Sequence, residues 1–507
     1  MAIPATLQLS TILSGWPLGL LCIVLCIGTF LVLGWPFQSS AEIPIVNGKQ
    51  RWELFSTNAK RRFRFNAEEL IRLGFSEKSS PFMLETDLGP RLVLQQRYLD
   101  EIERDHRFTM YEAAEADHLL DLPGLETMFH GTLHTQMVGP AVVAMSKRLV
   151  QLTNPLSEEA VVGLKEQWTE SSDWHEISLQ PTMAAIVARL SSLAFLGNEL
   201  CRDPTWLEIA VNFTITRVIA VQDVQMWPRV LQPLVHWFLP SCWKLRAQVR
   251  QARQVINPAL ELEKLRLASH DSSPFRILGW SHQFARGRRY DPTIAQLRLT
   301  FVAIHTTADM MMKVILNICQ HAHLIEEMRR EVISVVGKHG LNHSSLQRLH
   351  LMDSVMKEVQ RLEPASIVTM ARCTVDRVVL SDGTTIPKGT QIIFPNVHMR
   401  ESSASTSSAQ FDGYRFLRMR EDTNMAKFAA FTSPSSSHMG FGYGKHACPG
   451  RYFAADEIKI LLCHILLMYD VRLVDTHIPE VYRYGFTLPR DPKARILVRR
   501  RPEEINI

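Results

Sequence analysis

The stretch that decides the fold is FGYGKHACPG, which runs from Phe441 to Gly450 and holds one cysteine, Cys448, among three glycines. Glycine lets a backbone approach a flat ligand closely and adopt positive φ angles. The residues that follow, PGRYFAADEIKILLCHILLMY, predict a helix that begins just after Cys448. Free backbone N–H groups and the positive end of that helix would stabilise a cysteine thiolate.

A cysteine in such a loop has several uses. Thiolates ligate haem iron, zinc and iron–sulfur clusters, and they also act as nucleophiles. Zinc and iron–sulfur sites need three or four closely spaced ligands, and the nearby His438, His446, Cys463 and His464 match no such pattern. No local residue is an evident base for a nucleophile. The residues favour a single axial ligand for haem, and the other uses stay open.

Composition narrows the class of protein. The chain has 507 residues, of which 46% are hydrophobic and 21% charged, with a net charge of +5. These values are ordinary for a globular protein, exclude a disordered chain and do not indicate a nucleic-acid partner. Eight cysteines without a C-x-x-C pair predict unpaired thiols in a reducing compartment.

The N-terminus predicts a membrane anchor. No charged residue precedes Glu42, and Leu18–Gly34 is almost wholly apolar. Its 17 residues would span about 26 Å as a helix, close to the thickness of a thin bilayer. The basic run KRRFR at residues 60–64 follows it and predicts a cytosolic location for the rest of the chain. We expect an anchor at residues 1–40 and a catalytic domain at 41–507; the rival, a cleaved signal peptide ending near SSA (39–41), lacks a basic leader.

The remainder predicts one large, mainly α domain with a minor β region. The segment from Asp291 to His323 has an N-cap aspartate, a proline at the first helical position and about 30 residues without a breaker, so we expect a long, central, buried helix. Arg372–Phe394 alternates and carries Asp-Gly and Lys-Gly turns, which predicts short strands. The biased stretch ESSASTSSAQ at 401–410 predicts a surface loop.

Two further motifs are weak alone. In KEVQR, Glu358 and Arg361 share a helix face, but an isolated pair of this kind is usually exposed and contributes little. In AIHTTAD (303–309), the polar His305, Thr306 and Thr307 interrupt an apolar helix. Either the threonines bond to carbonyls one turn back, or a local break in the helix leaves room for a ligand or water.

Taken together, the motifs resemble the cytochrome P450 family. The haem-loop pattern F-x-x-G-x-[HR]-x-C-x-G is met by Phe441, Gly444, His446, Cys448 and Gly450, and E-x-x-R by Glu358 and Arg361. FDGYRF (411–416) matches the segment that supplies a further arginine, Arg415. The resemblance covers essentially the whole chain and implies a P450 fold with an N-terminal single-pass transmembrane helix. EIPIVN, FLGNELCRDPTW and GKHACPGRYFA resemble filamentous-fungal members of secondary metabolism.

The resemblance implies roles for these residues. Cys448 would be the axial thiolate ligand of haem b, with Phe441, Gly444 and Gly450 shaping the loop around it. His446 and Arg372 would lie near haem propionates, and Glu358, Arg361 and Arg415 would form a buried structural triad. Thr307 would be the distal threonine that holds water and helps deliver protons. Two features depart from the family: Thr306 replaces the usual acid, so that His305 or a water chain would have to substitute, and no W-x-x-x-R motif occurs around residues 125–150.

The substrate pocket is expected on three segments: Phe301, Val302 and His305; Ser366, Ile367, Val368, Thr369 and Met370; and Phe486 and Thr487. They are apolar with a few hydroxyls, which suits a large lipophilic substrate. VQMWPRVLQPLVHWFLP (Val224–Pro240) is either ordinary core or an entrance that dips into a membrane.

The function implied by the resemblance is that of a membrane-anchored haem-thiolate monooxygenase in the endoplasmic reticulum, with its catalytic domain in the cytosol. It would take electrons from NADPH through a cytochrome P450 reductase, with a small cytochrome b as a further donor. It would activate O₂ and oxidise a terpenoid, indole diterpene, meroterpenoid or polyketide hybrid. One alternative is a haem-thiolate enzyme that catalyses a rearrangement, ring expansion or C–C coupling; another is a non-enzymatic haem-binding sensor.

Overall fold

A computed structural model describes residues 43–53, 56–77, 81–125, 131–269, 276–396, 399, 410–475 and 479–505. Met1–Pro44 and Ile45–Ile507 are separate compact units, and the fold given below is that of the second. The expected anchor at Leu18–Gly34 and residues 401–409 of the expected surface loop lie outside the described residues.

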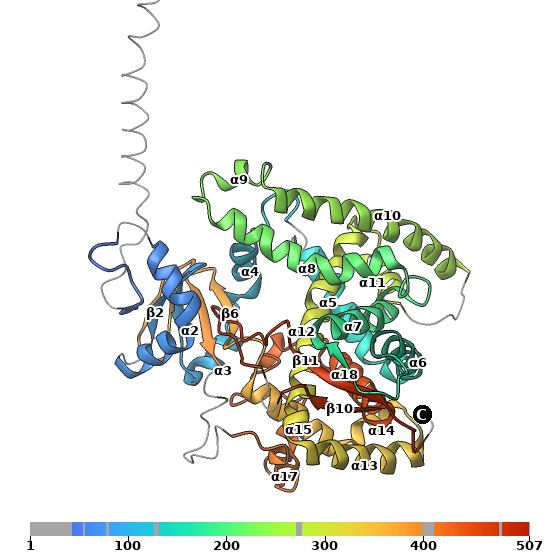
Figure 1. The fold of residues 1–507 in the computed structure, drawn as a ribbon. Coiled ribbons are helices and arrows are strands. Elements are labelled where there is room, and N and C mark those ends of the chain that lie inside the picture. The colour runs from blue at the N-terminus through green and yellow to red at the C-terminus, as the bar shows by residue number, and fades with distance from the viewer. Residues whose placement is uncertain are drawn as a thin grey trace, which may run out of the picture. The chain divides into compact units, whose positions relative to one another are not determined.

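Helices make up most of the described chain, as the sequence predicts (Figure 1). The α-helices are α2 (Thr57–Glu77), α3 (Leu99–Arg104), α4 (Met110–His118), α5 (Gly131–Ser146), α6 (Leu149–Trp168), α7 (Leu179–Leu196), α8 (Pro204–Gln225), α9 (Gln232–Val235), α10 (Pro240–Ala268), α11 (Ile277–Ala285), α12 (Pro292–Gln320), α13 (Ala322–His339), α14 (His343–Arg348), α15 (His350–Leu362), α17 (Arg415–Met419) and α18 (Arg451–Met468). Short 3₁₀ turns are η1 (Gln96–Tyr98), η3 (Ala426–Phe428) and η4 (Gly444–His446).

The strands form three small sheets. They are β1 (Ile45–Val46), β2 (Phe82–Thr86), β3 (Gly89–Val93), β4 (Phe108–Thr109), β5 (His175–Ser178), β6 (Val368–Thr374), β7 (Val378–Val379), β8 (Thr385–Ile386), β9 (Gln391–Pro395), β10 (Tyr469–Leu473) and β11 (Arg495–Arg500). The largest sheet has the order β1-β2-β3-β9-β6-β4, and the others are β10-β11-β5 and β7-β8. The region predicted to be β, Arg372–Phe394, thus supplies the end of β6 and most of β9 to a mixed sheet, and it contains β7 and β8.

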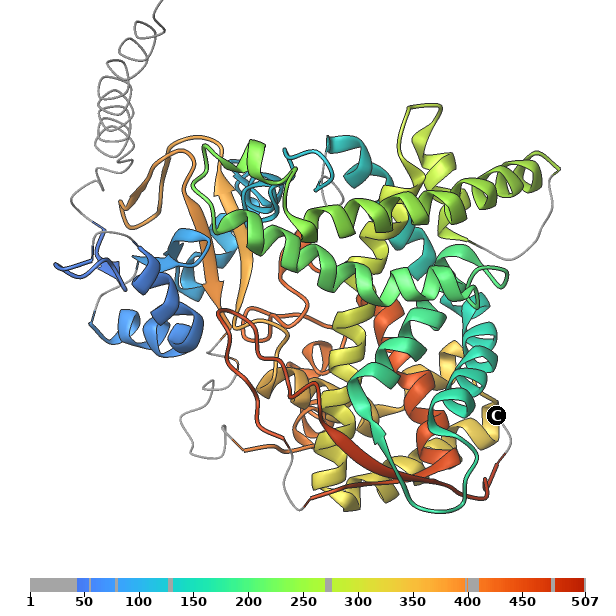
Figure 2. The ribbon, with the colours of Figure 1, turned by 45° about the horizontal axis from the view of Figure 1, so that its top comes forward.

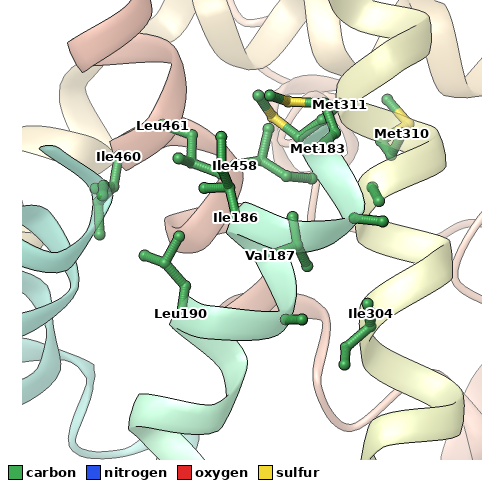
Figure 3. Close-up of a cluster of buried hydrophobic side chains, with 14 of the residues drawn as sticks. Met183, Ile186, Val187, Leu190, Ile304, Met310, Met311, Ile458, Ile460 and Leu461 are labelled. Atoms are coloured by element: carbon green, nitrogen blue, oxygen red, sulfur yellow. The ribbon is translucent and has the colours of Figure 1, made fainter. Parts of the chain in front are cut away.

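The long central helix is α12, which begins as the sequence predicts. The Asp291 carboxylate caps it by accepting hydrogen bonds from the backbone N–H groups of Thr293 and Ile294, at 3.0 and 3.2 Å. The helix packs against α7, α8 and α10 and lies among them in Figure 2. Ile304 and Met311 of α12 turn toward Met183 and Val187 of α7, whose other side meets α18 (Figure 3). Three helix layers therefore form the apolar core beside the haem loop.

Two described helices, α7 and α12, are long and apolar enough to cross a membrane by length and composition. Most of each lies buried inside the protein, as expected of core helices. Their length and composition are therefore weak evidence that either helix spans a membrane.

Candidate active site

The loop that carries Cys448 is closed by its own backbone. The Cys448 N–H donates to the Phe441 carbonyl at 2.8 Å, so that the loop folds back on itself. Gly442 and Gly444 have φ angles of 77° and 65°, which side-chain-bearing residues rarely adopt. A Cβ atom at Gly444 would also overlap the side chain of Glu103. The backbone conformation and the close approach of another segment explain why glycine is needed here.

Cys448 lies at the N-terminus of α18. Burial raises the pKa of its thiol, while hydrogen bonds from the backbone N–H groups of Gly450 and Arg451 lower it. The Arg451 side chain donates to the carbonyls of Cys448 and Thr432, at 2.8 and 3.0 Å. Cys448 keeps accessible surface despite its deep position, which indicates that it faces an enclosed space rather than the outer surface.

Glu358 and Arg361 of α15 form part of a buried network. The Glu358 carboxylate is 0% exposed and accepts hydrogen bonds from Arg361 Nε at 2.7 Å and Arg415 Nε at 3.0 Å. It also accepts from the Asp412 backbone N–H at 3.1 Å, and Arg361 donates to the Met399 carbonyl at 3.0 Å. The structure thus brings together Glu358, Arg361 and Arg415, and the pair is not the exposed one that local spacing alone allows.

Sequence reasoning missed the residue before Glu358. The Lys357 ammonium is buried and donates to the carbonyls of Phe428, Ala430 and Ser433, at 2.6, 2.8 and 2.8 Å. These acceptors belong to the segment that leads into the haem loop. Lys357 lies next to Glu358 on a helix that is buried over most of its length, and this position is the one signal in the sequence that could have pointed to Lys357.

Arg372 lies close enough to His446 for its charge to affect the pKa of the imidazole. Burial lowers the pKa of Arg372 to about 10, and burial together with the Arg372 charge lowers the pKa of His446. The Arg372 guanidinium donates to the Ala371 carbonyl at 2.7 Å and contacts Met370 Sδ at 3.4 Å. The Glu103 carboxylate raises the pKa of Arg372, but no carboxylate of the described residues lies within 4 Å of the guanidinium. A buried cation of this kind calls for an anion.

The strand that carries Arg372 is irregular just before it. The pairing of β6 with β9 shifts register between Thr369 and Arg372, and Met370 has a φ angle of 55°. Such bulges re-aim side chains and often lie beside active sites. The bulge explains how Arg372 leaves the regular alternation of the sheet.

The three polar residues of α12 have different surroundings. Thr306 is exposed and donates from Oγ1 to the Val302 carbonyl one turn back, at 2.7 Å. His305 Nε2 lies 2.8 Å from the Val211 carbonyl of α8 and donates to it. Thr307 is buried, and none of the hydrogen bonds between described residues involves its hydroxyl. Residues 303–309 are helical throughout, so of the two alternatives the hydrogen bond to the carbonyl one turn back is the one found for Thr306.

The residues expected to line a pocket occupy different places. Ser366 pairs with Thr487, and the Ile367 N–H donates to the Phe486 carbonyl at 2.8 Å, so these two segments do meet. Ile367 itself is buried in the apolar cluster under the large sheet, with Val368 and Phe486 packed against that cluster. Met370 is buried at the bulge and Thr369 is half-buried.

The pocket residues of α12 lie elsewhere. Phe301 lies under the Arg217 guanidinium, 5.5 Å from ring centroid to Cζ, and makes an edge contact with His118. Val302 is 43% exposed although its helix is central. An accessible apolar residue on a central helix indicates open space beside α12.

Comparison with known proteins identifies the family to which these site residues belong. Residues 130–496 match the family model of cytochrome P450. The chain is 52% identical over 486 residues to cytochrome P450 monooxygenase cdmJ of Talaromyces verruculosus, covering 95% of this chain and 94% of that protein. It is 47% identical to cytochrome P450 monooxygenase roqO of Penicillium rubens, covering 94% and 95%, and 48% identical to fumitremorgin C monooxygenase of Aspergillus fumigatus, covering 93% and 94%.

The chain belongs to the cytochrome P450 family. This P450 has the family's mainly helical fold with small sheets, and its relatives are monooxygenases of fungal secondary metabolism. It is an oxidoreductase, and its family binds haem b through a cysteine thiolate. P450 monooxygenases act on small molecules and need redox partners.

The residues of this P450 fit a haem. The thiol of Cys448 is a suitable donor at a helix N-terminus. Arg372 offers a cationic partner for a propionate group, and the imidazole of His446, whose lowered pKa favours its neutral form, offers a hydrogen-bond donor. On α12, Val302 and Thr306 are exposed. The segment expected to carry W-x-x-x-R falls partly on residues whose side chains lie outside the described ones, and the further propionate contact stays unassigned.

Proposed function

We propose that Cys448 is the axial ligand of the haem and that this P450 oxidises a lipophilic fungal metabolite. The observation that carries the assignment is a thiol at the start of α18 that accepts backbone N–H hydrogen bonds while keeping accessible surface. Gly442 and Gly444 hold the loop in its required shape. Arg372 and His446 bind the propionates, and Glu358, Arg361 and Arg415 hold the loop's supporting segments in register.

Different residues of the chain have different roles in the proposed reaction. The haem, when bound, supplies the activation of O₂ and the oxidation of the substrate. The N–H groups of Gly450 and Arg451 favour the thiolate form of Cys448. Thr307 holds a water molecule in the cavity and passes protons through it. Val302 and Phe301 exclude bulk water from one side of the cavity and offer apolar contact to the substrate.

The substrate class rests on the relatives. One of them is, by its name, a monooxygenase of fumitremorgin C, and the others are fungal secondary-metabolite P450s. We infer a comparable lipophilic intermediate, such as a terpenoid, indole diterpene, meroterpenoid or polyketide hybrid. Electrons come from NADPH through a P450 reductase, with a small cytochrome b as a second donor.

The proposal of a membrane location rests on two features. The first is the apolar segment Leu18–Gly34. The second is a set of exposed apolar side chains around α9, the turn between α8 and α10 (Figure 1): Met226, Trp227, Val230, Leu231, Leu234, Trp237, Phe238 and Trp243. Several exposed apolar side chains within one short segment are typical of a membrane or protein contact, and aromatic residues favour the interface of a bilayer. The endoplasmic reticulum, with the catalytic domain in the cytosol, fits both.

A spectroscopic experiment tests the ligand. Cys448→Ala should abolish the thiolate-type carbon monoxide band of the reduced protein, while the matched control Cys319→Ala should keep it. Survival of the band in Cys448→Ala would show that the assignment is wrong. Turnover under ¹⁸O₂ tests the reaction: a product without label, at an intact turnover rate, would replace monooxygenation by rearrangement, ring expansion or C–C coupling.

A further inference from the structure

The Lys357 ammonium of α15 uses all three of its hydrogen-bond donors on one segment of backbone. It donates to the carbonyls of Phe428, Ala430 and Ser433 at 2.6, 2.8 and 2.8 Å, and its side chain is 1% exposed. Burial lowers the pKa of this group to about 7. A neutral amine, however, has only two N–H bonds to donate, so the three acceptors favour the ammonium. Lys357 therefore holds the segment 428–433 against α15.

The same helix also holds this segment through a carboxylate. Asp353 accepts a hydrogen bond from the Phe431 N–H at 2.9 Å. Asp353 lies one turn before Lys357, so the two side chains share a face of α15. The Asp353 carboxylate is in turn paired with Lys459 of α18, at 2.7 Å. One donor and one acceptor of α15 thus fix the backbone of residues 428–433, and the acceptor is linked to α18.

The helix α18 binds the remaining carbonyl of this segment and joins it to Cys448. Arg451 Nε donates to the Thr432 carbonyl at 3.0 Å, and Arg451 Nη1 donates to the Cys448 carbonyl at 2.8 Å. Arg451 also supplies one of the backbone N–H groups that hydrogen bond to the Cys448 thiol. One residue therefore connects the segment 428–433 to both the backbone and the sulfur of Cys448.

A ring contact provides a second connection. Phe431 is 1% exposed and makes an edge contact with Phe441, with 5.0 Å between the ring centroids. Phe441 is the first residue of the haem loop, and its carbonyl accepts the hydrogen bond from the Cys448 N–H at 2.8 Å. Because packed interiors transmit displacements, a shift of the Phe431 backbone would reach Cys448 through Phe441 as well as through Arg451.

On the basis of the proposed function, we infer that Lys357 is a positioning residue for the axial ligand. Its ammonium fixes the segment 428–433, and this segment holds Cys448 in place through Arg451 and Phe441. Without the ammonium, three buried carbonyls lose their donor, which is costly enough to displace the segment. The displacement removes the support of Arg451 and weakens the hold on the thiolate. Lys357 acts only through these other residues, so it is not a catalytic residue.

The experiment follows the thiolate-type carbon monoxide band of the reduced protein over time. Lys357→Met keeps the length of the side chain and removes its donors. The band of this variant should convert to that of a haem without a thiolate ligand about tenfold faster than in the parent, the factor that one lost hydrogen bond to a charged group corresponds to. Lys313→Met is the matched control. Lys313 is also 1% exposed but is paired with Asp309 on α12, so this variant should convert at the rate of the parent.

Two further measurements test the route from Lys357 to the ligand. In the double variant Lys357→Met with Arg451→Met, the increase in conversion rate should be smaller than the product of the two single increases, because both residues act on one connection. An increase equal to that product would overturn the route through Arg451. In hydrogen–deuterium exchange, the Phe431 amide should exchange faster in Lys357→Met than in the parent or in Lys313→Met.

The outcomes separate this inference from the proposed function. Absence of the thiolate-type band in the parent overturns the proposed function itself. With that band present, a parent-like conversion rate in Lys357→Met overturns the positioning role, even where its free energy of unfolding has fallen, since Lys357 would then be structural only. If Lys357→Met does not fold, Arg451→Met decides, because it cuts the connection to Cys448 and leaves the ammonium in place. A parent-like rate in Arg451→Met then overturns the inference.

Discussion

Glu457 is a carboxyl group that the fold buries without a counter-charge. It lies on α18, is 0% exposed, and accepts one hydrogen bond from Ser191 Oγ of α7 at 2.9 Å. Its other oxygen has no hydrogen-bond partner among the described residues. Burial raises the pKa of Glu457 to about 8, and the bond from Ser191 lowers it only in part. The side chain is therefore neutral when the protein is folded at pH 7.

The sign of the effect follows from linkage. In the unfolded chain a glutamate titrates near its ordinary value of 4.5. Between pH 4.5 and about 8 the folded protein binds a proton that the unfolded chain has released, so stability falls as the pH rises. Each pH unit in this window is worth about 1.4 kcal/mol, so at pH 7 the buried acid costs about 3 kcal/mol relative to pH 4.

The substitution Glu457→Gln isolates the pH-dependent contribution of this carboxyl group to the free energy of unfolding. The amide oxygen can still accept the bond from Ser191, and the amide does not titrate. The variant should gain up to about 3 kcal/mol in free energy of unfolding over the parent between pH 5 and pH 8. Urea unfolding followed by circular dichroism, at steps of one pH unit, measures this difference. Glu326→Gln, at an exposed acid on α13, is the control and should follow the parent at every pH.

The comparison across pH removes any constant cost of the substitution. Plots of unfolding free energy against pH that run parallel for Glu457→Gln and the parent would refute the reasoning. If the buried acid titrates between pH 4.5 and about 8, the difference between the two plots must change with pH. A gain that appeared only below pH 4.5 would also contradict it, since the sign would then be that of an acid stabilised in its charged form.

Three further perturbations test other parts of the site. Glu358→Ala leaves two guanidinium groups without their carboxylate and should cost about 3–5 kcal/mol in urea unfolding; a loss typical of a surface pair would show that the buried network is not needed. Gly444→Ala meets a positive φ angle and Glu103, so haem bound per chain, measured by absorbance, should fall, whereas full loading would contradict the close packing. The pKa of His343 is raised by its bond to Asp456. The melting temperature lost in His343→Gln should be largest below pH 6.5 and should disappear as the pH rises through the raised pKa; a constant loss would mean that charge plays no part.

The haem loop and the central helix were predictable because their signals are local. Glycines at positive φ, a cysteine before a helix start and the Asp291 cap depend on backbone sterics and hydrogen bonds within a few residues. The loop and the helix cap can therefore be predicted from the sequence without knowledge of the fold. The E-x-x-R pair was visible as a pattern, but its spacing is equally that of an exposed pair.

Other features depend on segments that meet only in the folded chain. The burial of Glu358 is completed by Arg415 and Asp412, more than 50 residues away, and Lys357 finds its carbonyls more than 70 residues away. The sequence by itself determined the family, the thiolate loop and the helix caps, since these follow from local conformation. The tertiary structure alone decided which charges are buried, paired or open to the cavity, since desolvation and long-range contacts set those energies.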